Sequence, residues 1–177
     1  MEPDLFTKLK EIVREIGQRV ELDRNDFLLQ AGKVERDVYF VESGLIRVFL
    51  LTEFEEHTIR FGYQGSFINS IASFLKVRPS EFYVQAVRKS VVWVVGKADW
   101  EGLLEQDAAW REWYTKLMEE VVCQQVEREI DLLTHSPAAR LKRVMERSPQ
   151  LFQEVPAKYI ASYLRMSPET LSRIRNS

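Results

Sequence analysis

The sequence predicts an α+β protein, with strands in its N-terminal part and helices in its C-terminal part. From about residue 20 to 98, short β-branched and aromatic runs are separated by turn residues. From about residue 99, apolar residues recur at three- and four-residue steps, and two short capped helices follow near the C-terminus. These patterns indicate a β-sandwich or barrel, a long helix and a helix-turn-helix.

The composition limits the classes of protein to consider. The single cysteine, Cys123, excludes an intrachain disulfide and a cysteine-ligated cluster, and His57 and His135 are too few for most metal sites. The apolar runs are far shorter than a membrane span, and the N-terminus lacks the basic and apolar regions of a leader. We expect a cytoplasmic protein without a membrane segment, a metal or a cofactor.

The charge is distributed unevenly along the chain. Residues 135–177 carry a net charge of +5, whereas the remainder carries −7. A basic segment on an acidic body favours a polyanionic partner at the basic end. A solvated helical surface would produce the same count, so charge alone leaves both interpretations open.

The N-terminal elements can be placed from their patterns. Helical spacing of apolar residues predicts a helix within residues 1–18, ending at Gly17. The runs that predict strands are FLLQAG, VYFVESG, LIRVFLL, HTIRFG, FYVQAV and SVVWVV. Several short strands at regular spacing are typical of a sandwich or barrel.

From about residue 99 the sequence is expected to be helical for over twenty residues. Its apolar stripe includes Trp113, Leu117 and Val121 and continues through Val122, Val126, Ile130 and Leu133. This stripe could pack on the β-domain of the same chain or form the seam of a two-stranded dimer, and we favour the dimer, formed through residues 108–134.

The C-terminal helices have clear boundaries. Ser136 and Pro137 begin a helix that ends before Pro149, and a turn, with any strand around Leu151–Val155, is expected next. A helix over about 157–164 is followed by a tight turn at Arg165, and Ser167 then caps a final helix. The apolar residues of a helix-turn-helix are Ile160, Ala161, Leu164, Met166, Leu171 and Ile174.

The last helix carries side chains that can reach bases and phosphates. Arg173 can be bidentate to guanine, and Glu169 can accept from a cytosine amino group. The remaining candidates for DNA contact are Lys158, Ser167, Thr170, Ser172 and Arg175. Arg165 occupies the turn position where glycine is usual, so a left-handed backbone there would cost roughly 1 kcal/mol.

The chain as a whole resembles the catabolite activator and fumarate-nitrate regulator (Crp/Fnr) family of bacterial transcription factors. The resemblance includes "FLLQAGKVERDVYFVESGLIRVF" with Gly32 and Gly44, "YQGSFINSIASFL", the long helix and "YIASYLRMSPETLSRI". It implies a double-stranded β-roll of the cyclic-nucleotide-binding type over residues 1–107, a dimerisation helix over 108–134 and a helix-turn-helix over 135–177. It also implies a homodimer on a near-palindromic operator, with RNA polymerase and an unidentified small-molecule effector as further partners.

The sensor part departs from members that bind cyclic nucleotides. Their cassette reads Phe-x-Gly-Glu followed by Arg-Ser/Thr-Ala, and here Asn69 and Ser70 replace the Gly and Glu, while Ser80 stands where the Arg is expected. A helix beginning at Asn69 or Ser70 could still attract an anion, but Glu81 would repel it. Arg78 could substitute by a shift in register. We expect a degenerate pocket at these five residues that does not bind cyclic AMP.

Other functions remain as alternatives. A cyclic-nucleotide-responsive regulator would need Arg78 as the substitute, and a protein-binding adaptor would use the basic tail without DNA. A metal-dependent β-barrel enzyme needs clustered histidines, and the β-rich half has only His57. The last helix ends the sequence, so we expect a helix-turn-helix without a C-terminal wing.

Overall fold

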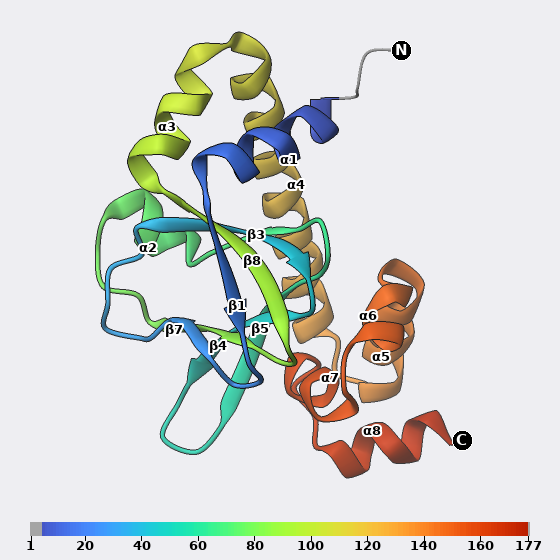
Figure 1. The fold of residues 1–177 in the computed structure, drawn as a ribbon. Helices are drawn as coiled ribbons and strands as arrows, with labels where there is room; N and C mark the ends of the chain where they lie inside the picture. The colour runs from blue at the N-terminus through green and yellow to red at the C-terminus, as the bar shows by residue number, and fades with distance from the viewer. Residues whose placement is uncertain (1–4, 177) are drawn as a thin grey trace. The chain divides into compact units, whose positions relative to one another are not determined.

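The computed structural model describes residues 5–176, and the description below is limited to these residues (Figure 1). The chain divides into two compact units, residues 1–55 with 59–103 and residues 56–58 with 104–177.

The first unit is a β-roll of two four-stranded sheets, with strand orders β1-β8-β3-β6 and β2-β7-β4-β5. Its strands are β1 (Gln18–Leu22), β2 (Phe27–Leu29), β3 (Asp37–Ser43), β4 (Ile46–Leu51), β5 (Glu56–Gly62), β6 (Phe67–Ile68), β7 (Phe82–Ala86) and β8 (Ser90–Gly96). Its helices are α1 (Leu5–Ile16), α2 (Ile71–Lys76) and the first part of α3 (Lys97–Gln106). The six expected strand runs are confirmed. Strands β1 and β6 were not expected, because QRVEL is mostly polar and FI is only two residues long.

Alternating residues of both sheets face inward and form the core. Register pairs such as Val48 with Val84 on β4 and β7 place apolar side chains on the same face. The core residues are Leu22, Leu29, Tyr39, Val41, Ile46, Val48, Ile68, Val84, Ala86 and Val92. The two sheets therefore enclose an apolar interior.

Two positions in this unit match the sequence signals closely. Gly17 follows α1, and its N–H donates to the Val13 carbonyl at 2.9 Å. Gly44, with φ +99°, joins β3 to β4, and a Cβ built there would lie 2.1 Å from the Ser90 Oγ. Only glycine fits at position 44, because both its backbone conformation and its proximity to Ser90 exclude a side chain. Residues 1–4 of the predicted leading helix lie outside the described residues.

The second unit is helical. It contains α4 (Ala108–Leu133), α5 (Pro137–Arg147), α6 (Pro149–Glu154), α7 (Ala157–Tyr163) and α8 (Pro168–Arg175), together with the end of α3 and the first three residues of β5. The helical region expected from about residue 99 consists of two helices, α3 and α4, and α4 coincides with the expected helix of residues 108–134. Asp107 separates them: its backbone is extended, and its side chain accepts from the Ala109 N–H at 2.9 Å.

The expected turn after α5 is also corrected. Residues Leu151–Val155, where a turn or strand was expected, belong to the short helix α6 and the residue that follows it. Pro149 stands at the first turn of α6, and Leu151 and Val155 are buried. A helix forms there because it buries these apolar residues against the helices around it.

Candidate nucleic-acid interface and ligand cassette

Helices α7 and α8 pack as a helix-turn-helix (Figure 1). Ile160 and Ala161 of α7, Leu164 directly after α7 and Leu171 of α8 are each 1% exposed. Ala161 is small, so α8 can lie close to α7 at this position. Met166 and Ile174 are half-buried at the edge of the contact.

The turn between these helices uses a left-handed residue. Arg165 has φ 53°, and the N–H of Met166 donates to the Ala161 carbonyl at 3.1 Å. The conformation that glycine usually supplies is therefore adopted by an arginine, whose Cβ makes it costlier by about 1 kcal/mol. Its side chain is exposed.

The start of α8 is fixed by two of the predicted site residues. The Ser167 Oγ accepts from the Thr170 N–H at 3.2 Å, and the two hydroxyl oxygens are also 3.2 Å apart. Hydrogen bonds from its own N–H and from Ser167 lower the pKa of Glu169, which keeps this side chain ionised. Ser167 and Thr170 thus serve as a helix cap, a role compatible with a phosphate contact.

The other predicted contact residues are exposed. Glu169, Ser172, Arg173 and Arg175 lie on the solvent side of α8. Lys158 is exposed at the start of α7, with its ammonium 4.5 Å from the centre of the Tyr159 ring. These side chains from two helices lie on one small helical module.

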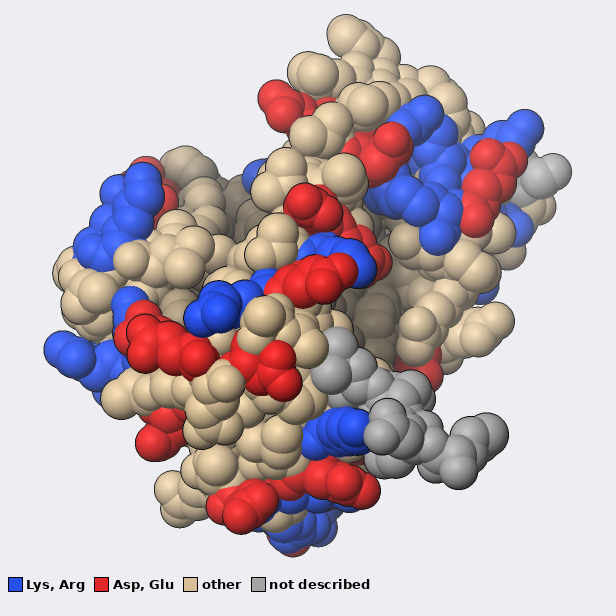
Figure 2. Space-filling view, turned by 90° about the horizontal axis from the view of Figure 1, so that it is seen from above, with Lys and Arg blue, Asp and Glu red and all other residues tan. Residues whose placement is uncertain are grey.

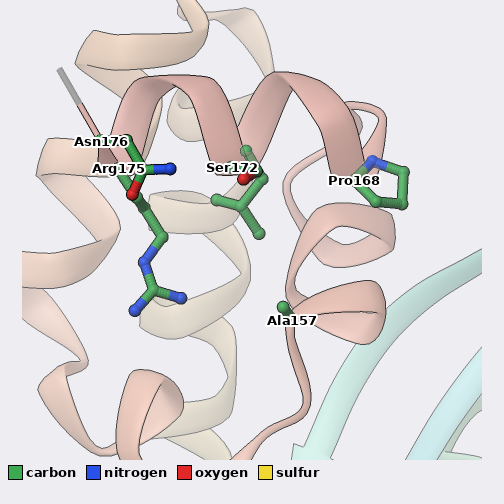
Figure 3. Close-up of a pocket in the computed structure, with 6 residues that line it drawn as sticks. Ala157, Pro168, Ser172, Arg175 and Asn176 are labelled. Atoms are coloured by element: carbon green, nitrogen blue, oxygen red, sulfur yellow. The ribbon is translucent and has the colours of Figure 1, made fainter.

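A groove of about 260 Å³ lies between α8 and the beginning of α7 (Figure 3). Figure 3 shows Arg175 extending from α8 on the side where Ala157 lies. The groove is lined by Ala157, Pro168, Leu171, Ser172, Arg175 and Asn176. A cation and a hydroxyl at the rim of an open groove provide the chemistry that binds a phosphate oxygen.

Part of the basic charge of the C-terminal segment is neutralised by α4. Arg143 Nε and Arg147 Nη2 contact the two carboxylate oxygens of Asp131 at 3.1 and 2.5 Å. Glu127 contacts the same arginines at 3.1 and 3.6 Å. Figure 2 shows the molecule from above, a different face from that of α8, and there too basic and acidic side chains are intermixed. The excess of +5 in the sequence therefore overstates the charge that a polyanion would meet.

Arg128 is a buried cation of the same helix. Its Nη1 donates to the Tyr163 carbonyl at 3.0 Å and its Nη2 to the Thr58 carbonyl at 2.8 Å, while its guanidinium carbon lies 3.9 Å from the Tyr163 ring centre. Ser162 donates to the Glu56 carbonyl at 2.6 Å and accepts from the Thr58 N–H at 2.9 Å. These bonds explain why residues 56–58 belong to the helical unit.

One face of α4 is apolar and exposed. Val122, Val126, Ile130 and Leu133 are 62%, 51%, 42% and 68% exposed, at spacings of four, four and three residues. Exposed apolar residues in such a row are typical of a protein-protein contact. Cys123 lies beside this row and is also exposed.

Three of the residues predicted to line a ligand pocket in the β-roll, Asn69, Ser70 and Ser80, make hydrogen bonds within the chain. The Ser70 and Ser80 hydroxyl oxygens are 2.8 Å apart, and the Ser80 Oγ also contacts both the N–H and the carbonyl of Phe82 at 2.9 Å. Asn69 donates to the Asp37 carbonyl at 3.3 Å. Of the five predicted residues, Ser70 and Ser80 therefore meet directly, whereas Arg78 and Glu81 are exposed.

The sequence did not predict that the carboxyl group of Glu35 is buried. It is 1% exposed and accepts from the Tyr39 hydroxyl at 2.9 Å and from three backbone N–H groups at 3.1 to 3.3 Å, those of Arg36, Asp37 and Ser70. Its own N–H donates to the Ser73 Oγ at 2.8 Å. Burial raises the pKa of Glu35 more than these hydrogen bonds lower it. No local sequence signal distinguishes this glutamate from exposed ones.

Two further findings concern the described residues as a whole. Among residues 5–176, no three His, Cys, Asp or Glu side chains are grouped so that they could share a metal ion. Within the same residues, every helix is too short or too polar to cross a membrane.

Comparison with known proteins gives the same fold. The chain matches the cyclic nucleotide-binding domain family over residues 19–107. It is similar to a CooA mutant from Carboxydothermus hydrogenoformans, with a TM-score of 0.77 and 16% identity over 99% of this chain and 84% of that one. FixK2 from Bradyrhizobium japonicum has a TM-score of 0.76 and 16% identity over 91% and 83%.

A third similar structure is the Catabolite Activator Protein of Thermus thermophilus, with a TM-score of 0.62 and 19% identity over 98% of this chain and 83% of that one. Among curated proteins, none is significantly similar in sequence. The family match spans half of the chain, so this protein belongs to the cyclic nucleotide-binding domain family and has the fold of the Crp/Fnr regulators.

Proposed function

We propose that this chain is a transcription regulator that binds double-stranded DNA in a sequence-specific manner as a homodimer. The observation that carries the proposal is the helix-turn-helix itself: α8 is anchored by buried Leu171 and presents Glu169 and Arg173 to solvent. A helix held on one face and polar on the other fits the major groove of B-DNA.

Base readout falls to Glu169 in the first turn of α8 and Arg173 in its last turn. Arg173 can donate two hydrogen bonds to a guanine, and Glu169, kept ionised by its cap, can accept from a cytosine. They are four residues apart, so they lie on one face of the helix and can read neighbouring base pairs.

Phosphate contacts fall to the surrounding residues. Arg175 and Ser172 line the groove of Figure 3, Lys158 lies at the start of α7, and Ser167 with Thr170 caps α8. Such contacts position a protein on DNA without reading sequence. They support binding whose strength falls steeply with salt.

Dimerisation falls to α4. The exposed row from Val122 to Leu133 would be covered by the same row of a second copy, related by a two-fold axis. Two recognition helices related in this way call for a near-palindromic operator with half-sites about one helical turn apart. A transcription regulator of this kind acts in the cytoplasm, where RNA polymerase is a further partner.

The β-roll supports a sensor that does not bind cyclic AMP. The hydroxyls of Ser70 and Ser80, which replace the expected Glu and Arg of the family's cassette, contact each other, and the Ser70 N–H donates to the buried Glu35 carboxyl. Without the arginine a cyclic phosphate lacks its charge-assisted partner, and the carboxylate of Glu81 would repel it. Any effector would therefore differ from a cyclic nucleotide in its chemistry.

Selection of bound sequences from random duplex DNA by the purified protein tests the proposal. We expect enrichment of an inverted repeat, and we expect the Glu169→Gln, Arg173→Ala double variant to lose the enrichment. Selection of no sequence, together with no salt-dependent gel shift on any DNA, would favour a protein-binding adaptor.

A further inference from the structure

We infer that Arg128 and Asp131 of α4 set the orientation of the recognition helix α8 relative to the apolar face of α4, and thereby select the spacing between operator half-sites. The inference rests on the proposed function. Arg128 and Asp131 are only 4% and 1% exposed, although most residues near them in α4 are exposed. Neither would contact DNA, so their effect is on geometry.

Asp131 joins α4 to α5. Its two oxygens are contacted by Arg143 and Arg147, which lie one turn apart on α5, and Glu127 adds a second carboxylate to the same pair. Two cations and two anions balance, and the Asp131 side chain is only 2% exposed. A network of this kind fixes direction better than apolar packing does, because each N–H must meet its oxygen.

Arg128 joins α4 to the helix-turn-helix directly. It donates to the carbonyl of Tyr163, the last residue of α7. Its guanidinium carbon also lies 3.9 Å from the centre of the Tyr163 ring. The turn that leads into α8 begins at the next residue. The other hydrogen bond of Arg128, to the Thr58 carbonyl at 2.8 Å, also holds the guanidinium in place.

We call the contacts of Arg128 and those of Asp131 the two clamps. Both residues lie on the side of α4 opposite to the exposed apolar row. At about 100° per residue, positions 128 and 131 are roughly half a turn from the mean direction of Val122, Val126, Ile130 and Leu133. One face of α4 thus holds the DNA-reading helices while the other is open to a second copy. The distance between two recognition helices in a dimer follows from these clamps.

Loosening one clamp should leave the surface of α8 unchanged and relax its position. Asp131→Asn removes the charge and keeps the shape, which leaves Arg143 and Arg147 with a weaker partner. Glu129→Gln is a matched control, because it makes the same carboxyl-to-amide change on an exposed position of the same helix.

The test measures affinity for the selected operator, for versions with one base pair added or removed between the half-sites, and for a single half-site. We expect the unmodified protein and Glu129→Gln to prefer one spacing by about tenfold or more. For Asp131→Asn this preference should shrink by about tenfold while affinity for the single half-site stays within about twofold.

An Asp131→Asn protein with the same spacing preference as the unmodified protein would overturn the inference and leave the proposed function intact. If neither the unmodified protein nor any of the variants binds DNA, that result would instead contradict the proposed function. If thermal melting shows that Asp131→Asn does not fold, Arg147→Gln decides by the same criterion. When Asp131→Asn and Arg147→Gln both fold, the variant that carries both changes should weaken the spacing preference no more than either change alone. The reason is that Asp131 and Arg147 belong to the same ion-pair network.

Discussion

The Tyr39 hydroxyl donates to the Glu35 carboxylate at 2.9 Å inside the β-roll, and among the hydrogen bonds and ion pairs identified for Glu35 none comes from a basic side chain. Burial therefore raises the pKa of Glu35 above its ordinary value of 4.5. Such a carboxyl stabilises the fold fully below its unfolded pKa, and this stability is lost as the pH rises through the folded pKa.

We expect Glu35→Gln to remove this loss. Urea unfolding between about pH 4 and 8 should show the free energy of unfolding of Glu35→Gln gaining on that of the unmodified protein as the pH rises. Glu81→Gln is the matched control, because it makes the same carboxyl-to-amide change at an exposed position of the same unit. A constant difference between Glu35→Gln and the unmodified protein over this range would contradict the raised pKa.

Cyclic AMP and cyclic GMP should not bind. The cassette hydroxyls of Ser70 and Ser80 are paired with each other, and no arginine stands at position 80. Isothermal titration calorimetry at high micromolar nucleotide should give no saturable heat. A saturable signal that is abolished by Arg78→Ala would show instead that Arg78 acts as the phosphate ligand.

The Val126→Glu change should convert a dimer into a monomer. Val126 is 51% exposed at the centre of the apolar row, and burying two carboxylates there without partners is costly. Sedimentation equilibrium at micromolar concentration measures the change. Gln124→Glu adds the same charge on the far face of α4 and should stay dimeric; a monomeric unmodified protein would contradict the predicted seam.

Arg173→Ala and Lys158→Ala should weaken DNA binding in different ways. Loss of a base contact by Arg173 should cost roughly 1 to 3 kcal/mol on the selected operator and little on an operator altered at the contacted base pair. Lys158→Ala should weaken both DNAs alike and reduce the salt slope by about one. Equal losses for both variants on both DNAs would assign base readout to other residues.

The Arg165→Gly change should stabilise the helix-turn-helix. Arg165 has φ 53°, a conformation that costs a side-chain-bearing residue roughly 1 kcal/mol and glycine nothing. Arg165→Ala is the control, because it removes the guanidinium and keeps the strain. Thermal unfolding should place Arg165→Gly above Arg165→Ala, and the reverse order would mean that the greater freedom of glycine in the unfolded chain outweighs the relief of strain.

The sequence by itself determined the elements whose signals are local. Ser167 with Pro168 and Ser136 with Pro137 cap α8 and α5 where expected, since a cap joins residues two or three positions apart. The alternating strands and the left-handed turn at Arg165 were also readable, because φ preferences and side-chain alternation act over a few residues.

Tertiary structure alone decided the contacts between residues far apart in the chain. Glu35 meets Ser70 across 35 positions, and Asp131 meets Arg147 across 16, and no local pattern marks either pair. The same is true of α6, which the sequence left as a turn and burial of Leu151 made a helix. A short helix is marginal alone, so its formation depends on the neighbours against which it packs.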